Sequence, residues 1–208
     1  MKQIILASAS PRRKELLGLL NTEFQIFPAV GEEVLTTSDP ARAVQELSGQ
    51  KAREVACRIF AETEGEVLVI GADTVVALDG EILGKPGSLE EAFSMIEKLQ
   101  GRTHSVFTGV TVIDRDVSGQ ERSRTFAEET FVTVSPMTET QIWTYVNRGE
   151  SLDKAGAYGI QGVFGAFVES IQGDYNNVVG LPVSRLYREL YDMGVDLLAT
   201  AEAKTGQA

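Results

Sequence analysis

The sequence contains one cysteine, Cys57, and one histidine, His104, among its 208 residues. A single cysteine excludes an internal disulfide framework and any multi-cysteine zinc site, and a single histidine excludes a histidine-rich metal site. Long apolar runs are missing too, because none approaches the ~20 residues that a membrane-spanning helix needs. The first apolar run is also too short for a signal peptide. We therefore expect a soluble, cytoplasmic protein that contacts no membrane.

Positive charge is scarce as well. The chain has 19 Lys and Arg against 30 Asp and Glu, a formal net charge of −11. A protein that binds duplex nucleic acid needs several cationic contacts with phosphates, so the sequence argues against nucleic acid as a partner. The acidic excess lies outside residues 1–60, where Lys and Arg slightly outnumber Asp and Glu. A small anion needs only a local cationic cleft, which we expect in this first third.

Helical and strand patterns alternate along the chain and predict an α/β fold with one domain, residues 1–198, and a frayed tail, 199–208. Ser10-Pro11 and Asp39-Pro40 each place a capping residue before a proline, the usual start of a helix. The helices are expected at residues 11–20, 40–63, 88–99, 138–149 and 182–193. The strands are expected at residues 3–7, 24–30, 67–70, 75–78, 82–83, 103–114, 123–135 and 164–171. The Asp79-Gly80 hairpin signal favours a mixed sheet over a purely parallel one.

The segment Ser8-Ala-Ser-Pro-Arg-Arg joins the first strand to the first helix. A helix N-terminus presents free N–H groups and the positive end of a dipole, which suits phosphate, and two hydroxyls and two arginines would strengthen such a site. Alternatively, Ser10 is only a cap and the arginines form a solvated face. The spacing is not that of a P-loop.

A second candidate is Gly71-Ala-Asp-Thr, which we expect at the end of a buried strand. An acidic residue there is costly unless it is paired, metal-bound or exposed in a cleft, and strand ends often carry ligand sites in α/β sheets. The alternative is an ordinary turn aspartate. Because Val75 stands two residues after Asp73, the Asp-x-Asp pattern of a haloacid-dehalogenase-type phosphatase is absent.

Other residues are ambiguous when taken singly. Glu33, Lys51 and Lys85 are each typical of solvated surface. His104 is expected to be a structural histidine with its hydrogen bonds satisfied, and Cys57 to lie on the buried face of its helix. The glycine-rich stretches 153–162 and 173–182 indicate close backbone approach either to a ligand or to another loop.

Taken together, six segments resemble the Maf family in their order and spacing, over residues 3–195. They are Ser8-Ala-Ser-Pro-Arg-Arg, Gly71-Ala-Asp-Thr-Val-Val, Gly84-Lys-Pro, Gly101-Arg-Thr-His, Asp153-Lys-Ala-Gly-Ala-Tyr-Gly-Ile-Gln-Gly and Gly173-Asp-Tyr-Asn-Asn-Val-Val-Gly-Leu-Pro. The resemblance implies a nucleoside triphosphate pyrophosphatase of Maf/ITPase-like fold. Such a fold has a mixed, largely antiparallel twisted sheet flanked by helices, with two lobes around a central groove. The resemblance also implies a homodimer.

The resemblance further implies roles for single residues. Asp73 matches the catalytic proton acceptor, and Arg12, Thr74 and Gln161 match positions tied to base preference. The arginine pair and the stretch 157–161 resemble the branch that prefers dTTP and UTP. The 7-methyl-GTP branch differs at both places.

The resemblance also implies which residues contact the triphosphate and a metal. Glu33 and Asp73 match carboxylates that hold a divalent metal, Mg²⁺ or Mn²⁺, which suits an all-oxygen site. The residues that match phosphate contacts are Ser8, Arg13, Lys51 and Lys85. The expected reaction is metal-assisted attack by water, giving a nucleoside monophosphate and pyrophosphate from dTTP, UTP or modified pyrimidine nucleotides. The rival hypotheses are a nucleotide-binding regulator of septum formation with little turnover, and a simple phosphatase.

Overall fold

The structure is a computed structural model that describes residues 2–199. The predicted tail, apart from Ala199, falls outside the described residues. No helix within residues 2–199 is long and apolar enough to cross a membrane.

Helices and strands alternate as the sequence predicts. The strands are β1 (Gln3–Leu6), β2 (Gln25–Ile26), β3 (Val67–Leu78), β4 (Glu81–Leu83), β5 (Thr103–Arg115), β6 (Glu121–Val134) and β7 (Val168–Gln172). The α-helices are α1 (Pro11–Gly18), α2 (Pro40–Glu62), α3 (Leu89–Leu99), α4 (Glu139–Val146), α5 (Tyr175–Val179) and α6 (Val183–Asp192). Two short 3₁₀ helices, η1 (Ala155–Ala157) and η2 (Val163–Phe167), precede β7. The predicted starts of α1 and α2 are confirmed, because Ser10 and Asp39 each accept a hydrogen bond from the third residue of the helix.

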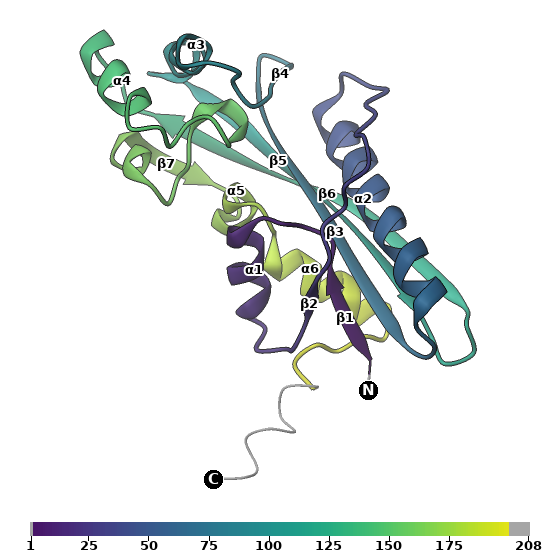
Figure 1. Cartoon of the computed structure of the whole chain (residues 1–208). Coiled ribbons are helices and arrows are strands. Elements are labelled where there is room, and N and C mark those ends of the chain that lie inside the picture. Colours follow the sequence, from purple (N-terminus) through teal and green to yellow (C-terminus); the bar gives the residue numbers. More distant parts are fainter. Residues whose placement is uncertain (1, 200–208) are drawn as a thin grey trace.

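All of the strands belong to one mixed sheet, in the order β2-β1-β3-β5-β6-β7, with β4 also paired to β3. Strand β1 is parallel to β2 and β3, and the remaining pairs are antiparallel. The long strands β3, β5 and β6 run diagonally through the molecule in Figure 1. The expected mixed, largely antiparallel sheet flanked by helices is confirmed.

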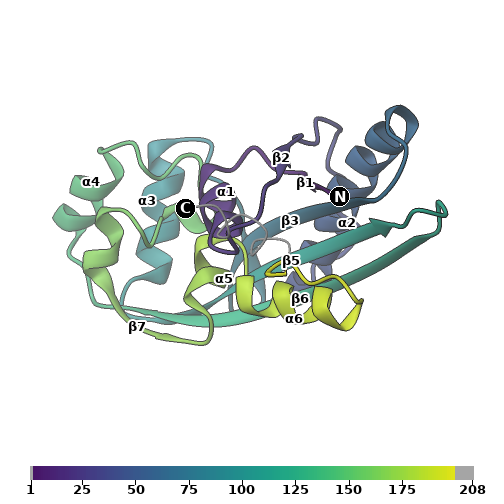
Figure 2. The same cartoon turned by 90° about the horizontal axis from the view of Figure 1, so that it is seen from below.

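The two faces of β3 are covered by different helices. Odd-numbered residues such as Val67 and Val69 pack against α2, whereas even-numbered residues such as Leu68 and Ile70 pack against α1 and α6. Further along the same strand, Val76 packs against α3 and α4. Figures 1 and 2 show α3 and α4 gathered at one end of the long strands, away from α2. Two apolar clusters, one on each face, thus lie near the start of β3 and a third lies at its far end, so the core divides into two lobes.

Strand β3 does not end where the sequence predicts. Instead of stopping at Ile70, it continues through Asp73, because β5 pairs with it all the way from Val67 to Ala77. Its other edge is interrupted: β1 pairs only as far as Ile70, and β4 begins to pair at Val76. Residues 71–75 therefore have a strand on one side and, among the described residues, none on the other.

Helix α2 lies unusually close to the sheet. A methyl group built on Gly109 would lie 2.2 Å from the carbonyl oxygen of Val44, and one on Gly71 would lie 2.6 Å from that of Ser48. Gly71 and Gly109 sit on adjacent strands, two residues apart in register. These two positions lack a side chain because the helix backbone fills the space.

The single histidine is a buried structural residue, as predicted, but the prediction that its hydrogen bonds are satisfied was wrong for one of its two ring nitrogens. His104 is 2% exposed, and its Nε2 shares a 2.7 Å hydrogen bond with the hydroxyl of Tyr158. Its Nδ1 has no partner among the described residues. Burial lowers the pKa of His104 to about 4, so the ring is neutral near pH 7.

Several local expectations were wrong. Cys57 is exposed, because the buried stripe of α2 runs through the neighbouring Ala56. The strand expected at 24–30 is only Gln25–Ile26, since the chain leaves β1 after Phe27. The strand expected at 164–171 begins as η2, and part of the second glycine-rich stretch folds as α5.

Replacing Gly109 with alanine should destabilise the protein by about 1–3 kcal/mol or more, because the added methyl group meets backbone atoms that cannot rotate away. Urea denaturation measures the loss. Gly18→Ala is the matched control, since nothing lies within 4 Å of the added methyl group and alanine favours the helix. Equal stability of the two variants would contradict the close seating of α2.

Stability should fall in acid partly because of His104. The pKa of His104 is about 4 in the folded protein, below the usual value of 6.5. Between these two values the unfolded chain binds a proton on His104 and the folded protein does not. The stabilisation is complete above about pH 6.5 and is lost as the pH falls toward 4. At 1.36 kcal/mol per pH unit, wild type should lose about 2–3 kcal/mol more than His104→Gln between pH 7 and pH 4.5. Parallel pH curves for the two proteins would contradict this.

Candidate active site

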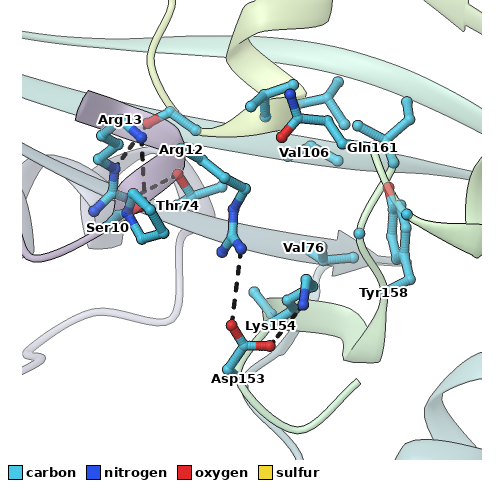
Figure 3. Close-up of a pocket in the computed structure, with 18 of the residues that line it drawn as sticks. Ser10, Arg12, Arg13, Thr74, Val76, Val106, Asp153, Lys154, Tyr158 and Gln161 are labelled. Atoms are coloured by element: carbon cyan, nitrogen blue, oxygen red, sulfur yellow. Dashed lines mark hydrogen bonds and ion pairs between the residues drawn. The ribbon is translucent and has the colours of Figure 1, made fainter. Parts of the chain in front are cut away.

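A pocket of about 460 Å³ opens at the interrupted edge of β3, between the two lobes. The start of α1 forms one wall, and the segment 150–162 faces it (Figure 3). The structure brings together most of the site residues that the sequence predicts. Those lining the pocket are Arg12, Arg13, Lys51, Asp73, Thr74, Lys85 and Gln161. Ser8 and Glu33 do not line it, but each contacts a residue that does.

Lys51 joins two carboxylates. Its ammonium makes a short ion pair with Asp73 and a second one, of 3.0 Å, with Glu33. Asp73 and Lys51 are largely buried, at 14% and 17% exposure, while Glu33 is half exposed. The contact exists because Asp73 faces α2 from β3, on the same side of the strand as Gly71, where the helix comes closest. A paired carboxylate therefore sits at the pocket wall, as the sequence argument requires of a buried aspartate.

Arg13 ties three elements together. Its guanidinium donates hydrogen bonds to the carbonyl of Gly180 at 2.9 Å, to Ser8 Oγ at 3.2 Å and to Thr74 Oγ1 at 3.0 Å. Burial lowers the pKa of Arg13, while the charge of Asp73 acts in the opposite direction. Three N–H groups of Arg13 are thus used in hydrogen bonds within the protein, and these bonds link α1 to β3 and to the end of α5. Its positive charge nevertheless remains at the pocket.

Arg12 reaches across the pocket. One of its terminal nitrogens lies 3.8 Å from a carboxylate oxygen of Asp153, which also pairs with Lys154 at 2.7 Å (Figure 3). Lys85, in the loop after β4, is exposed and pairs with no acidic side chain of the described chain. Arg12 and Lys85 are therefore the cations that can most readily turn to an incoming anion.

The opposite end of the pocket is less charged. Val76, Val106, Tyr158 and Ile160 line it, and Gln161 lies beside them (Figure 3). Gln161 is exposed, and its amide makes no hydrogen bond with any described residue. A flat, partly apolar wall with one free amide suits a ring that carries hydrogen-bonding groups. The pocket is thus cationic at one end and suited to a base at the other.

The wall that carries Gln161 is built on strained backbone. Ala157 has a φ of 62°, in the left-handed region that residues with a side chain seldom adopt. The hydroxyl of Tyr145 donates to the Ala157 carbonyl at 3.2 Å, and His104 holds the next residue, Tyr158. Two buried contacts from neighbouring elements thus hold this segment in place.

Some pocket residues were not singled out from the sequence. Glu15, Glu150, Asp153 and Lys154 all line the cavity. The last two belong to the first glycine-rich stretch, whose composition predicted close approach to a ligand or a loop without naming them. Gly180 supplies a backbone carbonyl, which no residue pattern would have revealed.

The two carboxylates beside Lys51 are also the candidate metal ligands. Within residues 2–199, no three His, Cys, Asp or Glu side chains lie close enough together to hold a metal ion. Mg²⁺ is usually bound by only one or two carboxylates together with substrate phosphates and water. Asp73 and Glu33 fit that donor set, because both carboxylates already contact one cation, the ammonium of Lys51.

Comparisons with known proteins agree on one family. The family model described as Maf-like protein matches residues 3–193. A dTTP/UTP pyrophosphatase from Agathobacter rectalis is 51% identical over 205 residues, covering 95% of this chain and 100% of that protein. A dTTP/UTP pyrophosphatase from Lachnoclostridium phytofermentans is 46% identical over 198 residues, covering 95% of this chain and 98% of that protein.

Among solved structures, a HAM1 protein from Coxiella burnetii has 15% identity and a TM-score of 0.47, covering 92% of this chain and all of that one. A similarity this distant supports no conclusion about function. The family match and the close relatives both extend along nearly the whole chain, and both agree with the family that the sequence resembles. The chain therefore belongs to the Maf family.

Proposed function

We propose that the protein hydrolyses dTTP and UTP to the nucleoside monophosphate and pyrophosphate. The observation that carries this proposal is the pocket itself, whose lining combines the paired Asp73 and Lys51, further cationic side chains and an apolar end that carries a free amide. The names of the relatives that share about half of the sequence support the same activity. Modified pyrimidine nucleotides would enter by the same route.

The triphosphate lies at the cationic end. Arg12 and Lys85 contact it directly, and Lys51 contributes its charge from the side of α2. Arg13 and Ser8 act mainly by holding the start of α1 in place, since they bond to each other and to the protein. Positive charge fixed in advance favours the transition state, because hydrolysis concentrates negative charge on the departing pyrophosphate.

Asp73 is the general base. It takes a proton from the attacking water, whose oxygen bonds to phosphorus while the anhydride bond between the α- and β-phosphates breaks. Lys51 holds the carboxylate in place from α2. Asp73 and Glu33 would hold the divalent metal, Mg²⁺ or Mn²⁺, which when bound offsets negative charge on the phosphates.

The base lies at the apolar end. Uracil and thymine both present a carbonyl at position 4 beside an N3–H, and the amide of Gln161 complements that pair. Arg12 and Thr74 would affect base preference from the other side, Thr74 through its bond to Arg13. Residues 1–198 act as one catalytic domain of two lobes, in a cytoplasmic homodimer.

Replacing Asp73 with asparagine should lower kcat by about 10²–10⁴, the usual effect of losing a general base, with the fold unchanged. Pyrophosphate released from dTTP with Mg²⁺ is the measurement, and circular dichroism checks the fold. Asp79→Asn, at the exposed turn after β3, is the matched control and should retain wild-type turnover. A folded Asp73→Asn protein with normal kcat would remove Asp73 from the reaction.

Replacing Gln161 with glutamate should lower kcat/KM for dTTP and UTP by about ten- to a hundredfold, because a carboxylate has no N–H for the base carbonyl. CTP, which can donate its amino group to the carboxylate, should lose less. Steady-state kinetics on the three nucleotides test this. An equal loss on all three would mean that Gln161 supports the loop without reading the base.

Product analysis separates the proposed activity from its rivals. Wild-type protein incubated with dTTP and Mg²⁺ should release pyrophosphate over many turnovers. Stoichiometric binding without release would support a nucleotide-binding regulator, and orthophosphate with a diphosphate product would indicate a phosphatase. A preference for 7-methyl-GTP would place the chain in the other branch.

A further inference from the structure

The loop between β2 and α2 contains a segment, Val30–Thr36, which we call the strap. It forms no helix or strand, and every residue in it is exposed; Val30 is 81% and Val34 is 56% exposed. Burial of apolar surface therefore contributes little to its position. Such a segment would ordinarily be mobile.

Side chains of α2 hold the strap instead. Glu54 accepts hydrogen bonds from the amides of Val30 and Gly31, at 2.9 and 3.0 Å. Gln50 bonds to both the amide and the carbonyl of Val34, at 2.9 and 2.5 Å. Glu46 accepts from the amide and the hydroxyl of Thr36, at 3.0 and 2.7 Å.

These three side chains form a regular ladder. Glu46, Gln50 and Glu54 are spaced four residues apart, so they project from one face of α2 on successive turns. The strap lies close against them, since a methyl group on Gly31 would come within 2.9 Å of Glu54 Oε2. The same hydrogen bonds lower the pKa of Glu46 and of Glu54.

Glu33 stands in the middle of the strap, between the segments that Glu54 and Gln50 hold. Its carboxylate reaches Lys51 at 3.0 Å, and Lys51 belongs to the same helix as the ladder. Lys51 in turn contacts Asp73 at the pocket. Helix α2 therefore holds Glu33 in two ways. The ladder fixes the strap backbone on both sides of Glu33, and Lys51 binds the Glu33 carboxylate.

We propose that Glu54 and Gln50 are positioning residues that hold Glu33 beside Lys51 and Asp73 for the reaction. The inference rests on the role of Glu33 given under the proposed function. Neither residue touches the pocket; each acts through the strap backbone. Without the ladder, the half-exposed ion pair with Lys51 is the contact that remains, among the described residues, to keep the second carboxylate at the site.

Glu54→Gln tests this. The glutamine amide oxygen can still accept one hydrogen bond from the strap, but the amide NH₂ group replaces the second carboxylate oxygen and faces a strap N–H from which it cannot accept a hydrogen bond. We expect kcat for dTTP to fall about tenfold or more, the range seen when groups that orient a ligand are lost, with KM within twofold. Hydrogen exchange of the peptide containing residues 30–36 should become faster. Glu62→Gln, at the exposed end of α2 away from the strap, should change neither measurement.

The combination with Glu33→Gln decides whether Glu54 acts through Glu33. If it does, the double variant Glu33→Gln/Glu54→Gln should be no slower than Glu33→Gln alone. Multiplied losses in the double variant would overturn the proposal, as would faster strap exchange with an unchanged kcat.

The result for Glu33→Gln separates this inference from the proposed function. Pyrophosphate release by wild type, with a loss in Glu33→Gln and none in Glu54→Gln, overturns only the ladder. Normal kcat in Glu33→Gln overturns both the role of Glu33 and the ladder, and leaves the pyrophosphatase activity standing.

Discussion

The close seating of α2 on Gly71 and Gly109 is the contact on which the site depends. It brings the helix backbone against β3 and β5, and Lys51 projects from that helix to Asp73 on β3. Asp73 pairs in register with Gly109, so the missing side chain on β5 and the charged side chain on β3 lie next to each other. A larger residue at either glycine would lift the lysine from its partner. The same contact therefore determines both how α2 packs on the sheet and where Lys51 meets Asp73.

The pocket adds a second constraint, since its cations must be held in place without all of them being neutralised. Arg13 is committed to the protein and Lys51 to two carboxylates, whereas Arg12 is only loosely paired with Asp153. The cations therefore divide into fixed charges and movable ones. A triphosphate that enters this pocket therefore meets positive charges that are already in place, and only one or two side chains need to turn toward it.

Local chemistry explains which parts of the structure could be predicted from the sequence. The starts of α1 and α2 follow from a capping side chain and a proline within a few residues, and Thr138 with Gln141 forms a capping box at the start of α4, where a helix was expected. The continuation of β3 through Asp73 could not be predicted, because its partner β5 lies more than thirty residues away and the polar Asp-Thr pair looks like a strand end.

The residues of the site likewise differ in how far the sequence alone predicts them. Ser8 to Arg13 signal an anion site by their own spacing, whereas Glu33, Lys51 and Lys85 are typical surface residues taken singly and were assigned only through the family resemblance. The ladder of α2 was not foreseen, since acidic and amide side chains four residues apart also describe any solvated helix face. What distinguishes them is the backbone they bond to, which belongs to a loop with no pattern of its own.

The interrupted edge of β3 has a consequence for how the protein behaves in a crowded solution. Unpaired strand edges are templates on which other chains can add, and proteins commonly shield them. Here Asp73 and Thr74 of the unpaired edge line the pocket, between the start of α1 and the segment 150–162, with Arg12 and Asp153 reaching toward each other across it. Another strand could pair with this edge only by displacing one of these walls. The same geometry that makes a site for a nucleotide therefore protects the sheet from edge-to-edge aggregation.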